Sequence, residues 1–364
     1  MPRFQDFCLL LALSVAAVQL PSRAHADEGV GGMIARATGF LRASQQESGS
    51  FSPEGVPDYT ALVIAALLES GTQVDDPMVQ QALAHLQGNV QEDGGIYQSG
   101  SRYRNYETCL AILAFSAANT GGDYDGLLAD AEAFAKKLQW DEGEGVDPTG
   151  TSYGGAGYGR HKRPDMSNSN MFAEALVALG NGPDDPAMQR LLVFVSRCQN
   201  LESEYNTTEF AGLNPDGGFY YTIAAGGSSQ AGETANGGLR SYGSMTYAGL
   251  KSMIYAGVTA DDPRVKAAVK WVSQHYSVEQ NPGMGTAGYY YYLHTLAKAL
   301  GVMGVDTLAD ANGVERNWRA DLAAELASRQ NKDGSWTNAN RRWLEGDANL
   351  VTGYVLLTLA NCQR

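Results

Sequence analysis

An internal repeat of paired helical segments is the feature that most constrains the fold. Six segments carry apolar residues at i, i+3, i+4 and i+7 against charges on the other face, which is typical of helices that bury one stripe. Each is followed by a segment that is apolar nearly all round, and such a helix must be covered on every side. The polar-faced segments are 33–45, 77–90, 127–140, 186–199, 263–276 and 318–330, and the apolar ones are 58–71, 106–121, 168–180, 244–257, 289–301 and 349–362.

A turn motif joins the two helices of a pair, and its clearest copy is QNKDGSW at residues 330–336. Weaker copies include QEDGGIY and LNPDGGFYY. Asp-Gly or Gly-Gly supplies the positive φ of a turn, the Gln can bond free backbone at a helix end, and the aromatic residue can wedge between repeats. Three polar-faced segments begin with Asp-Asp-Pro. This pattern predicts helix capping by Asp with Pro in the first helical position, and not a pair of catalytic acids.

Six such hairpins close most naturally into a ring, because an open solenoid would expose its last apolar inner face. We therefore predict an all-α fold, an (α/α)6 toroid in which six apolar helices stand inside six polar-faced ones. The ring fills a single domain, residues 27–364.

The first 26 residues have the pattern of a secretory signal peptide. An apolar run, CLLLALSVAAVQL, is followed by PSRAHA, whose last alanine, Ala26, fits a cleavage site. The pattern predicts a secreted or periplasmic protein, cut near Ala26. No later stretch approaches the roughly 18 uncharged apolar residues of a membrane span, so we expect none in the mature chain.

The net charge and the cysteine content argue against several classes of partner and cofactor. The formal net charge is −14, which argues against a nucleic-acid partner. Beyond the signal segment remain Cys109, Cys198 and Cys362, enough for at most one intrachain disulfide. They lack CxxC spacing and neighbouring histidine pairs, so we interpret them as buried apolar residues and expect neither a metal nor a cofactor.

The Gln-x-x-Asp-Gly-Ser-Trp turn and the six hairpins resemble the squalene cyclase and protein prenyltransferase repeat family, over about residues 33–362. The resemblance implies an α-α toroid whose central cavity holds an isoprenoid chain. Function still has to be argued from the residues of the site.

The resemblance does not extend to the zinc site of the prenyltransferases. Their Asp-x-Cys pair at the start of an inner helix is matched here by Tyr242, Gly243 and Ser244. His294 resembles their lone histidine, but a zinc site needs about three protein ligands. We interpret His294 as a core or cavity histidine.

The proton-donating motif of the class II terpene cyclases, Asp-x-Asp-Asp-Thr-Ala, is also incomplete. Its middle Asp falls on Asp58, but Val56 and Tyr59 replace the flanking acids. A catalytic acid needs neighbouring acids and burial to keep it protonated. Asp58 is the candidate catalytic residue of the chain, with helix capping as the alternative interpretation.

Basic residues precede several of the apolar segments. If all inner helices start at one end of the ring, these side chains and the helix N-termini converge on one rim and favour an anion. The alternative is that the arginines pair with Glu92, Asp93, Asp165 and Glu345. The basic residues are Arg102, Arg104, Arg160, His161, Lys162, Arg163, Arg240, Arg341 and Arg342.

Aromatic residues accompany these charges. In the run Tyr289 to Tyr292 successive side chains point about 100° apart, so we expect one or two of the four to line the cavity. Together these residues predict a binding site for a small hydrophobic or amphiphilic anionic ligand. The proposed ligand-binding residues are Arg104, Tyr106, Arg163, Arg240, Tyr242, His294 and Arg341.

Three functions remain open at this level. The first is a toroid that binds or processes an isoprenoid or similar ligand. The second is a non-catalytic lipid-binding toroid, because both catalytic signatures are missing. The third is a secreted polysaccharide lyase, in which an Arg or amide neutralises a uronate and a Tyr or His abstracts a proton. Its residues would be His161, Arg240, Tyr242 and Asn105.

Overall fold

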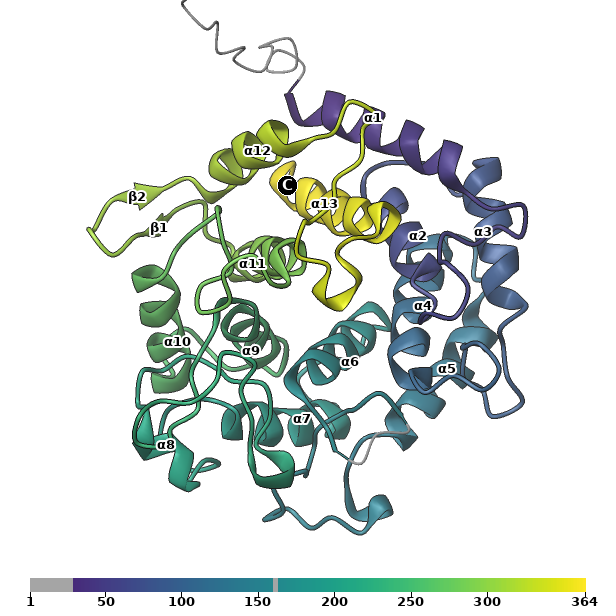
Figure 1. The fold of residues 1–364 in the computed structure, drawn as a ribbon. Coiled ribbons are helices and arrows are strands. Elements are labelled where there is room, and N and C mark those ends of the chain that lie inside the picture. Colours follow the sequence, from purple (N-terminus) through teal and green to yellow (C-terminus); the bar gives the residue numbers. More distant parts are fainter. Residues whose placement is uncertain (1–28, 160–162) are drawn as a thin grey trace, which may run out of the picture.

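Two concentric rings of helices form the body of the protein in the computed structural model, which describes residues 29–159 and 163–364 (Figure 1). The inner ring consists of α2 (Thr60–Glu69), α4 (Arg104–Ala118), α6 (Met166–Ala178), α9 (Gly243–Tyr255), α11 (Tyr289–Met303) and α13 (Ala348–Cys362). The outer ring consists of α1 (Gly29–Ser44), α3 (Pro77–Gln87), α5 (Asp125–Lys137), α7 (Pro186–Arg197), α10 (Pro263–Gln274) and α12 (Trp318–Arg329).

The inner ring is closed. Each inner helix packs against the next, and α13 packs against both α2 and α1. All twelve helical segments of the repeat are present, with ends that differ by a few residues from the sequence pattern. The predicted all-α toroid is therefore confirmed.

Shorter elements in the connections were not predicted. They are η2 (Glu142–Glu144), α8 (Glu209–Leu213), η3 (Ala224–Gly226), η4 (Arg342–Leu344) and the antiparallel pair β1 (Leu308–Ala309) and β2 (Glu315–Arg316). The predicted signal peptide, residues 1–26, lies outside the described residues. Within the described ranges, the helices are too short or too polar to cross a bilayer.

The glutamines of the turn motif join neighbouring repeats. In four turns, the side-chain amide of the Gln donates to a carbonyl of its own turn and to one near the beginning of the next outer helix. The paired acceptors are Gly49 and Met78 for Gln45, Gly154 and Ala187 for Gln139, Gly217 and Arg264 for Gln199, and Gly334 and Met33 for Gln330. The last pair connects the final turn to α1 and closes the outer ring.

The glycine in the clearest turn is required by close packing. Gly334 has a φ of 94°, and a Cβ there would lie 2.4 Å from the carbonyl oxygen of Arg36 in α1. The aromatic residue of the same turn, Trp336, is fully buried and donates its indole N–H to the carbonyl of Leu326 at 2.9 Å. Leu326 belongs to α12 of the same hairpin, so this bond holds Trp336 within its own repeat, and the wedge between repeats stays a prediction.

A second repeated contact ties each turn to its inner helix. The backbone N–H at or next to the aromatic position donates to a hydroxyl in the first turns of the inner helix, which satisfies a buried amide. The pairs are Phe51 with Thr60, Ile96 with Thr108, Ala156 with Ser169, Phe219 with Thr246 and Trp336 with Thr352, at 3.0–3.3 Å.

The Asp-Asp-Pro sequences cap helices as predicted. The second Asp of each, namely Asp76, Asp185 and Asp262, accepts a backbone N–H of the first helical turn at 2.8–2.9 Å. Proline occupies the first helical position in α3, α7 and α10. These acids lie on the outer ring, away from its centre, and serve to start helices.

Candidate ligand-binding cavity

A cavity of about 410 Å³ lies inside the ring, at the end where the inner helices begin. Its walls come from the N-caps and first two turns of these helices, together with the loops around residues 55–57 and 343–345. This position confirms that the starts of the inner helices converge. Eight tyrosines line it: Tyr59, Tyr103, Tyr106, Tyr158, Tyr221, Tyr242, Tyr291 and Tyr354.

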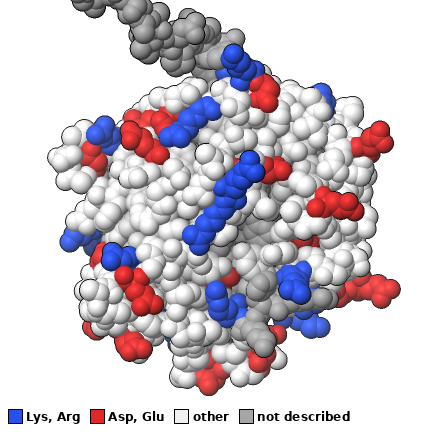
Figure 2. Space-filling view, viewed as in Figure 1, with Lys and Arg blue, Asp and Glu red and all other residues white. Residues whose placement is uncertain are grey.

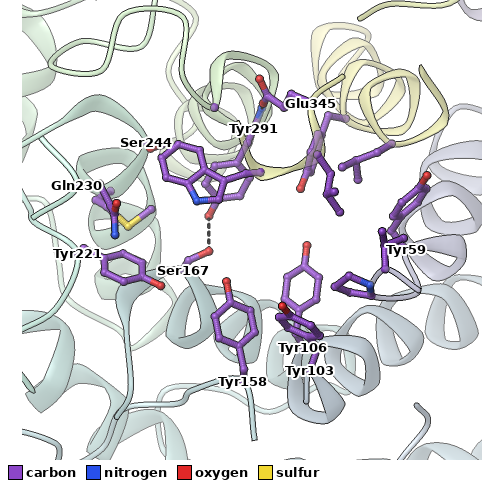
Figure 3. Close-up of a pocket in the computed structure, with 18 of the residues that line it drawn as sticks. Tyr59, Tyr103, Tyr106, Tyr158, Ser167, Tyr221, Gln230, Ser244, Tyr291 and Glu345 are labelled. Atoms are coloured by element: carbon purple, nitrogen blue, oxygen red, sulfur yellow. Dashed lines mark hydrogen bonds between the residues drawn. The ribbon is translucent and has the colours of Figure 1, made fainter. Parts of the chain in front are cut away.

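The tyrosine hydroxyls give the cavity a polar interior on an aromatic wall. Figure 3 shows the hydroxyls of Tyr106, Tyr158 and Tyr291 pointing into the space, and the Tyr291 hydroxyl lies 3.5 Å from Oγ of Ser167. Burial raises the pKa of Tyr158 and of Tyr291 above the usual phenol value. The hydroxyls therefore remain protonated and can donate to a ligand oxygen.

Only one residue of the run Tyr289 to Tyr292 is in the lining, and it is Tyr291. Tyr289 and Tyr292 instead donate their hydroxyls to the carbonyls of Val278 and Ser277, at 2.6 and 2.7 Å. The expectation that one or two of the four face the cavity is therefore confirmed.

The charge of the lining is acidic. Among the described residues, it contains one carboxylate, Glu345, and neither lysine nor arginine. Oxygen Oε1 of Glu345 accepts the backbone N–H of Tyr291 at 2.8 Å, and Oε2 accepts an amide N–H of Asn338 at 2.7 Å. Burial raises the pKa of Glu345, and these hydrogen bonds oppose the shift.

The amides at the starts of several inner helices are bound by the chain's own carboxylates. Asp165 accepts the backbone N–H of Asn168 in α6 at 3.0 Å, and Asp347 accepts that of Asn349 in α13 at 2.9 Å. Glu345 does the same for α11. The electropositive helix ends that could attract a ligand anion are thus already neutralised at these three helices.

The arginines expected at the rim do not line the cavity. Arg104 donates to the carbonyl of Gly159 at 3.0 and 3.2 Å, and Arg240 donates to the carbonyl of Glu233 at 2.9 Å. The Arg163 guanidinium lies over the ring of Tyr221, 5.1 Å from its centroid. Arg341 is exposed. Of the seven proposed ligand-binding residues, the structure brings only Tyr106 and Tyr242 into the cavity wall.

The described residues suggested for a lyase do not line one common pocket. Arg240 borders a separate peripheral pocket with Asp216 and Trp271, whereas Tyr242 lines the central cavity. Asn105 is buried and donates to the carbonyl of Gly157 at 2.7 Å. His161, like Arg160 and Lys162, lies outside the described residues.

Asp58 is absent from the cavity lining and contacts the outer helix α3. Its Oδ2 lies 2.8 Å from Nε2 of His85 in α3, and its Oδ1 accepts the backbone N–H of Thr60 at 2.8 Å. Burial raises the pKa of Asp58, but the hydrogen bonds from His85 and Thr60 outweigh it and hold the pKa below its usual value. A carboxylate held ionised is a poor proton donor. The N-cap position of α2 is Tyr59, and Asp58, one residue earlier, binds the first amide of the helix.

A buried charged cluster, Glu174, Lys251 and His294, lies deeper in the ring than the cavity. Glu174 in α6 and Lys251 in α9 form an ion pair, and His294 in α11 is 5% exposed, with its ring stacked on Tyr354 at 6.0 Å between centroids. Glu174 follows the lining residue Ser167 by seven residues, which places it about 10 Å further along its helix.

The protonation states of this cluster follow from burial and charge. Burial would raise the pKa of Glu174, but Lys251, Lys298 and His294 outweigh it and hold the pKa at about 2. Burial lowers the pKa of His294 to about 3, so the imidazole is neutral at neutral pH. Sequence reasoning missed Glu174 and Lys251, although each is the only charged side chain of its helix.

The described residues include all three cysteines that follow the predicted signal segment. Cys109, Cys198 and Cys362 are all free thiols, and burial raises the pKa of Cys109 and of Cys362 to about 12. Within residues 29–159 and 163–364, no group of three His, Cys, Asp or Glu side chains is arranged to hold a metal ion.

No protein-family model matches the chain, and no curated protein matches it either. Among solved structures, it is similar to the type II terpene cyclase MstE from Scytonema without ligand, at a TM-score of 0.53 and 15% identity, covering 91% of this chain and 97% of that one. A variant of MstE in complex with geranylgeranyl dihydroxybenzoate, its substrate, gives a TM-score of 0.54 at 15% identity, covering 92% and 97%. At such identity the likeness shows the fold alone: the chain is a helical toroid that shares its fold with this cyclase.

Proposed function

We propose that this chain binds an isoprenoid amphiphile in its central cavity, with an oxygen-bearing group held by the tyrosine hydroxyls. The observation that carries the proposal is the converging set of protonated hydroxyls from Tyr106, Tyr158 and Tyr291 on an otherwise aromatic wall. The volume of about 410 Å³ falls within the range of small-molecule sites. The similarity in fold to a cyclase whose named substrate carries a geranylgeranyl chain supports the isoprenoid class.

The sequence predicted an anionic ligand. We propose a negative charge only for the end of the ligand that stays at the rim of the cavity. Among the described residues, the cavity lining holds the carboxyl group of Glu345 and no cation, so an anionic group at depth would have no partner of opposite charge there. A hydroxyl, carbonyl or ether oxygen accepts from a phenol without that cost. Any anionic group of the ligand would remain at the rim, where Arg341 and Arg342 are exposed.

The test compares two probes of similar size, a polyprenol and the corresponding hydrocarbon, by titration calorimetry. Replacing Tyr106, Tyr158 and Tyr291 by Phe removes three hydroxyls and keeps the rings. We expect the triple variant to lose roughly 1–3 kcal/mol of affinity for the polyprenol, because two or three neutral hydrogen bonds are lost. Its affinity for the hydrocarbon should be unchanged.

The matched control is Tyr289→Phe, which removes a hydroxyl from the same tyrosine run outside the cavity. It should leave both affinities unchanged. Equal losses for the two probes, or no binding of either probe by the wild-type protein, would exclude the proposed site.

One residue of the cavity wall, Glu345, supports a catalytic form of this function. Glu345 is the carboxylic acid in the cavity wall, and burial raises its pKa, as protonation of an alkene by an acid requires. Incubation with a polyprenol should then give a cyclised product in the wild type and none in Glu345→Gln. Tight binding without product in the wild type would instead support the non-catalytic lipid-binding alternative.

We also propose that the protein acts outside the cytoplasm after cleavage near Ala26. The support is the sequence pattern of residues 1–26. The intact mass of the protein purified from its own host decides the matter, because removal of these residues gives a chain that begins near Asp27. A full-length chain retained inside the cell would contradict the proposal.

A further inference from the structure

The long connection from α7 to α9 runs beside the outer helix α10 (Figure 1), and a second cavity lies between them. Its volume is about 450 Å³, which falls within the range of small-molecule sites. No described residue lines both this cavity and the central one. We call it the peripheral pocket, and its lining includes Asn214, Asp216, Arg240, Ser241, Trp271 and His275.

The carboxylate of Asp216 holds the wall of the peripheral pocket together. Its Oδ1 accepts the hydroxyl of Ser241 at 2.6 Å and the backbone N–H of Gly218 at 2.9 Å. Its Oδ2 accepts the side-chain amide of Asn214 at 3.2 Å and the indole N–H of Trp271 at 3.3 Å. A carboxylate has about four acceptor sites, so these bonds leave Asp216 little capacity to bind a ligand. Its role is to fix the groups around it.

Arg240 gives the pocket a positive charge in a fixed position. Its Nε donates to the carbonyl of Glu233 at 2.9 Å, and its backbone N–H donates to the carbonyl of Gly232 at 3.0 Å. No ion pair includes Arg240 among the described residues, and its two terminal nitrogens make no hydrogen bond there. A guanidinium with two unused nitrogens can bind a carboxylate through two parallel hydrogen bonds.

This unpaired state sets Arg240 apart from many basic residues of the chain. Basic and acidic side chains are interspersed on the face of the ring shown in Figure 2. Pairs such as Arg316 with Asp310, at 2.8 Å, are common in the described ranges. In a chain of net charge −14, an arginine that has no carboxylate partner and lines a pocket is available to an anionic ligand.

His275 supplies an acceptor on a flat surface. Its ring stacks on that of Trp271, with 4.1 Å between centroids and 18° between planes. Its Nδ1 lies 2.9 Å from the carbonyl oxygen of Trp271. Because a carbonyl can only accept, the proton of the neutral ring is on Nδ1, and Nε2 has a lone pair. The side chain is exposed, so a ligand hydroxyl can donate to Nε2.

Asn214 adds a second acceptor. Its amide nitrogen donates to Asp216 at 3.2 Å and to the carbonyl of Leu239 at 3.1 Å, which uses both of its hydrogens. The amide oxygen accepts no hydrogen bond within the described ranges. The groups that remain for a ligand are therefore one charged double donor and two neutral acceptors.

We propose that the peripheral pocket binds a carboxylate that also carries several hydroxyl groups, of the sugar-acid class. The carboxylate binds the terminal nitrogens of Arg240, and hydroxyls donate to His275 and Asn214. The stacked imidazole offers an apolar contact to the C–H face of a sugar ring. An anion without hydroxyls would leave both acceptors unpaired.

The site binds its ligand without cleaving it. Tyr242 and Asn105, the other described residues considered for a lyase, are absent from the lining of the peripheral pocket. The site is also separate from the isoprenoid site, so its occupant is independent of the ligand in the central cavity.

NMR titration of the protein with D-glucuronate, D-glucuronamide and acetate tests the proposal. The reporter is the indole N–H of Trp271, which bonds Asp216 in the pocket wall, and Trp271→Phe assigns its signal among the five tryptophans. We expect glucuronate to bind roughly tenfold more tightly than glucuronamide, which has the same hydroxyls without the charge. Acetate, which has the charge without the hydroxyls, should bind more weakly than glucuronate.

Two variants separate the charged contact from the neutral ones. Arg240→Gln should remove the preference for glucuronate over glucuronamide. His275→Phe keeps a flat ring on Trp271 and removes the acceptor, so both sugars should bind roughly fivefold more weakly while the preference remains. The matched control is Lys266→Gln, which removes one charge from an exposed position of α10 outside the lining and should alter neither affinity. An unshifted Trp271 signal in each variant without ligand shows that the pocket is intact.

The proposal is overturned if glucuronate leaves the Trp271 signal unmoved, or if Lys266→Gln weakens binding as much as Arg240→Gln does. Acetate binding as tight as that of glucuronate would also overturn it, because the pocket would then be a plain anion site. The central cavity gives an independent readout, since His275 is absent from its lining. His275→Phe should keep the wild-type affinity for a polyprenol.

Discussion

In this ring, the side-chain amide of a single glutamine can join one repeat to the next. Gln199 is fully buried, and its amide nitrogen donates to the carbonyls of Gly217 at 2.9 Å and Arg264 at 2.8 Å, so one side chain joins α7, its turn and α10. An alanine there would leave the buried carbonyl of Gly217 without this partner, whereas the carbonyl of Arg264 keeps its hydrogen bond within α10. The sequence predicted that the Gln bonds free backbone, but the second acceptor could be identified only from the structure, because it lies on the next repeat.

The first prediction follows from these two bonds. Gln199→Ala should lower the free energy of unfolding by about 1–3 kcal/mol, since one buried carbonyl, that of Gly217, is left unpaired. Urea denaturation followed by circular dichroism measures the change. Gln274→Ala, at an exposed position of α10, is the control and should have little effect. Equal stability of the two variants would show that the bridge contributes nothing.

The candidate site could be predicted only partly at the residue scale. Tyr106 and Tyr242 were identified because they accompany the basic residues near the starts of apolar segments, and the structure places both in the wall. The arginines failed as a group because a long side chain in a loop can turn to a nearby carbonyl, as Arg104 and Arg240 do. The direction of such a side chain depends on the loop conformation, which the helical period does not determine.

At the scale of elements, an ion pair connects two inner helices that are otherwise apolar. Lys251 of α9 is 0% exposed and contacts Glu174 of α6, which also accepts from Asn170 at 3.2 Å. Burying two charges costs several kcal/mol for each ion, and their attraction offsets this only while both are present. The pair therefore contributes more to the alignment of α6 and α9 than to net stability.

The second prediction concerns this pair. Lys251→Met alone should lower the free energy of unfolding by about 3–5 kcal/mol, because the Glu174 carboxylate is left buried without its partner. The double variant Glu174→Leu/Lys251→Met should regain most of that loss. Denaturant unfolding of the two variants and the wild type measures both effects. A double variant less stable than the single one would contradict the argument.

The pair also predicts how stability depends on pH. The pKa of Glu174 is held at about 2, below the value of about 4.3 for an unfolded Glu, so its contribution is present above that unfolded value. It is lost as pH falls from there towards 2. The wild type should therefore lose more stability between about pH 5 and about pH 3 than Glu174→Leu/Lys251→Met does. Identical slopes in the two proteins would mean that Glu174 is not held ionised.

At the scale of the molecule, the fold could be predicted because six helix pairs repeat one pattern. Closing the pairs into a ring covers the apolar faces of all the inner helices. The informative feature of the sequence was the contrast between helices that are apolar on one face and helices that are apolar nearly all round. The β1–β2 hairpin, α8 and the long connection between α7 and α9 could not be predicted, because they interrupt the repeat and have no second copy to compare. The cavity depends on these insertions, since Tyr221 and Gln230 come from one of them.

Closure of the ring gives the fourth prediction. The chain ends at α13, which packs against α1, and Gln330 bonds the start of the ring to its end (Figure 1). In a circular permutant, a short linker would join residue 364 to residue 29. It would connect an inner helix to an outer helix, as the loops between successive repeats do. A permutant opened at Asn312 in the exposed β1–β2 loop should fold, with a free energy of unfolding within about 2 kcal/mol of the wild type. A permutant opened inside α9 should not fold.

The ion pair of Glu174 and Lys251 lies in the interior of the ring beneath the tyrosine-lined cavity. An isoprenoid chain that extended past the tyrosines would next meet these charges, and apolar groups gain nothing from such a contact. The pair therefore limits the length of apolar chain that the ring can take.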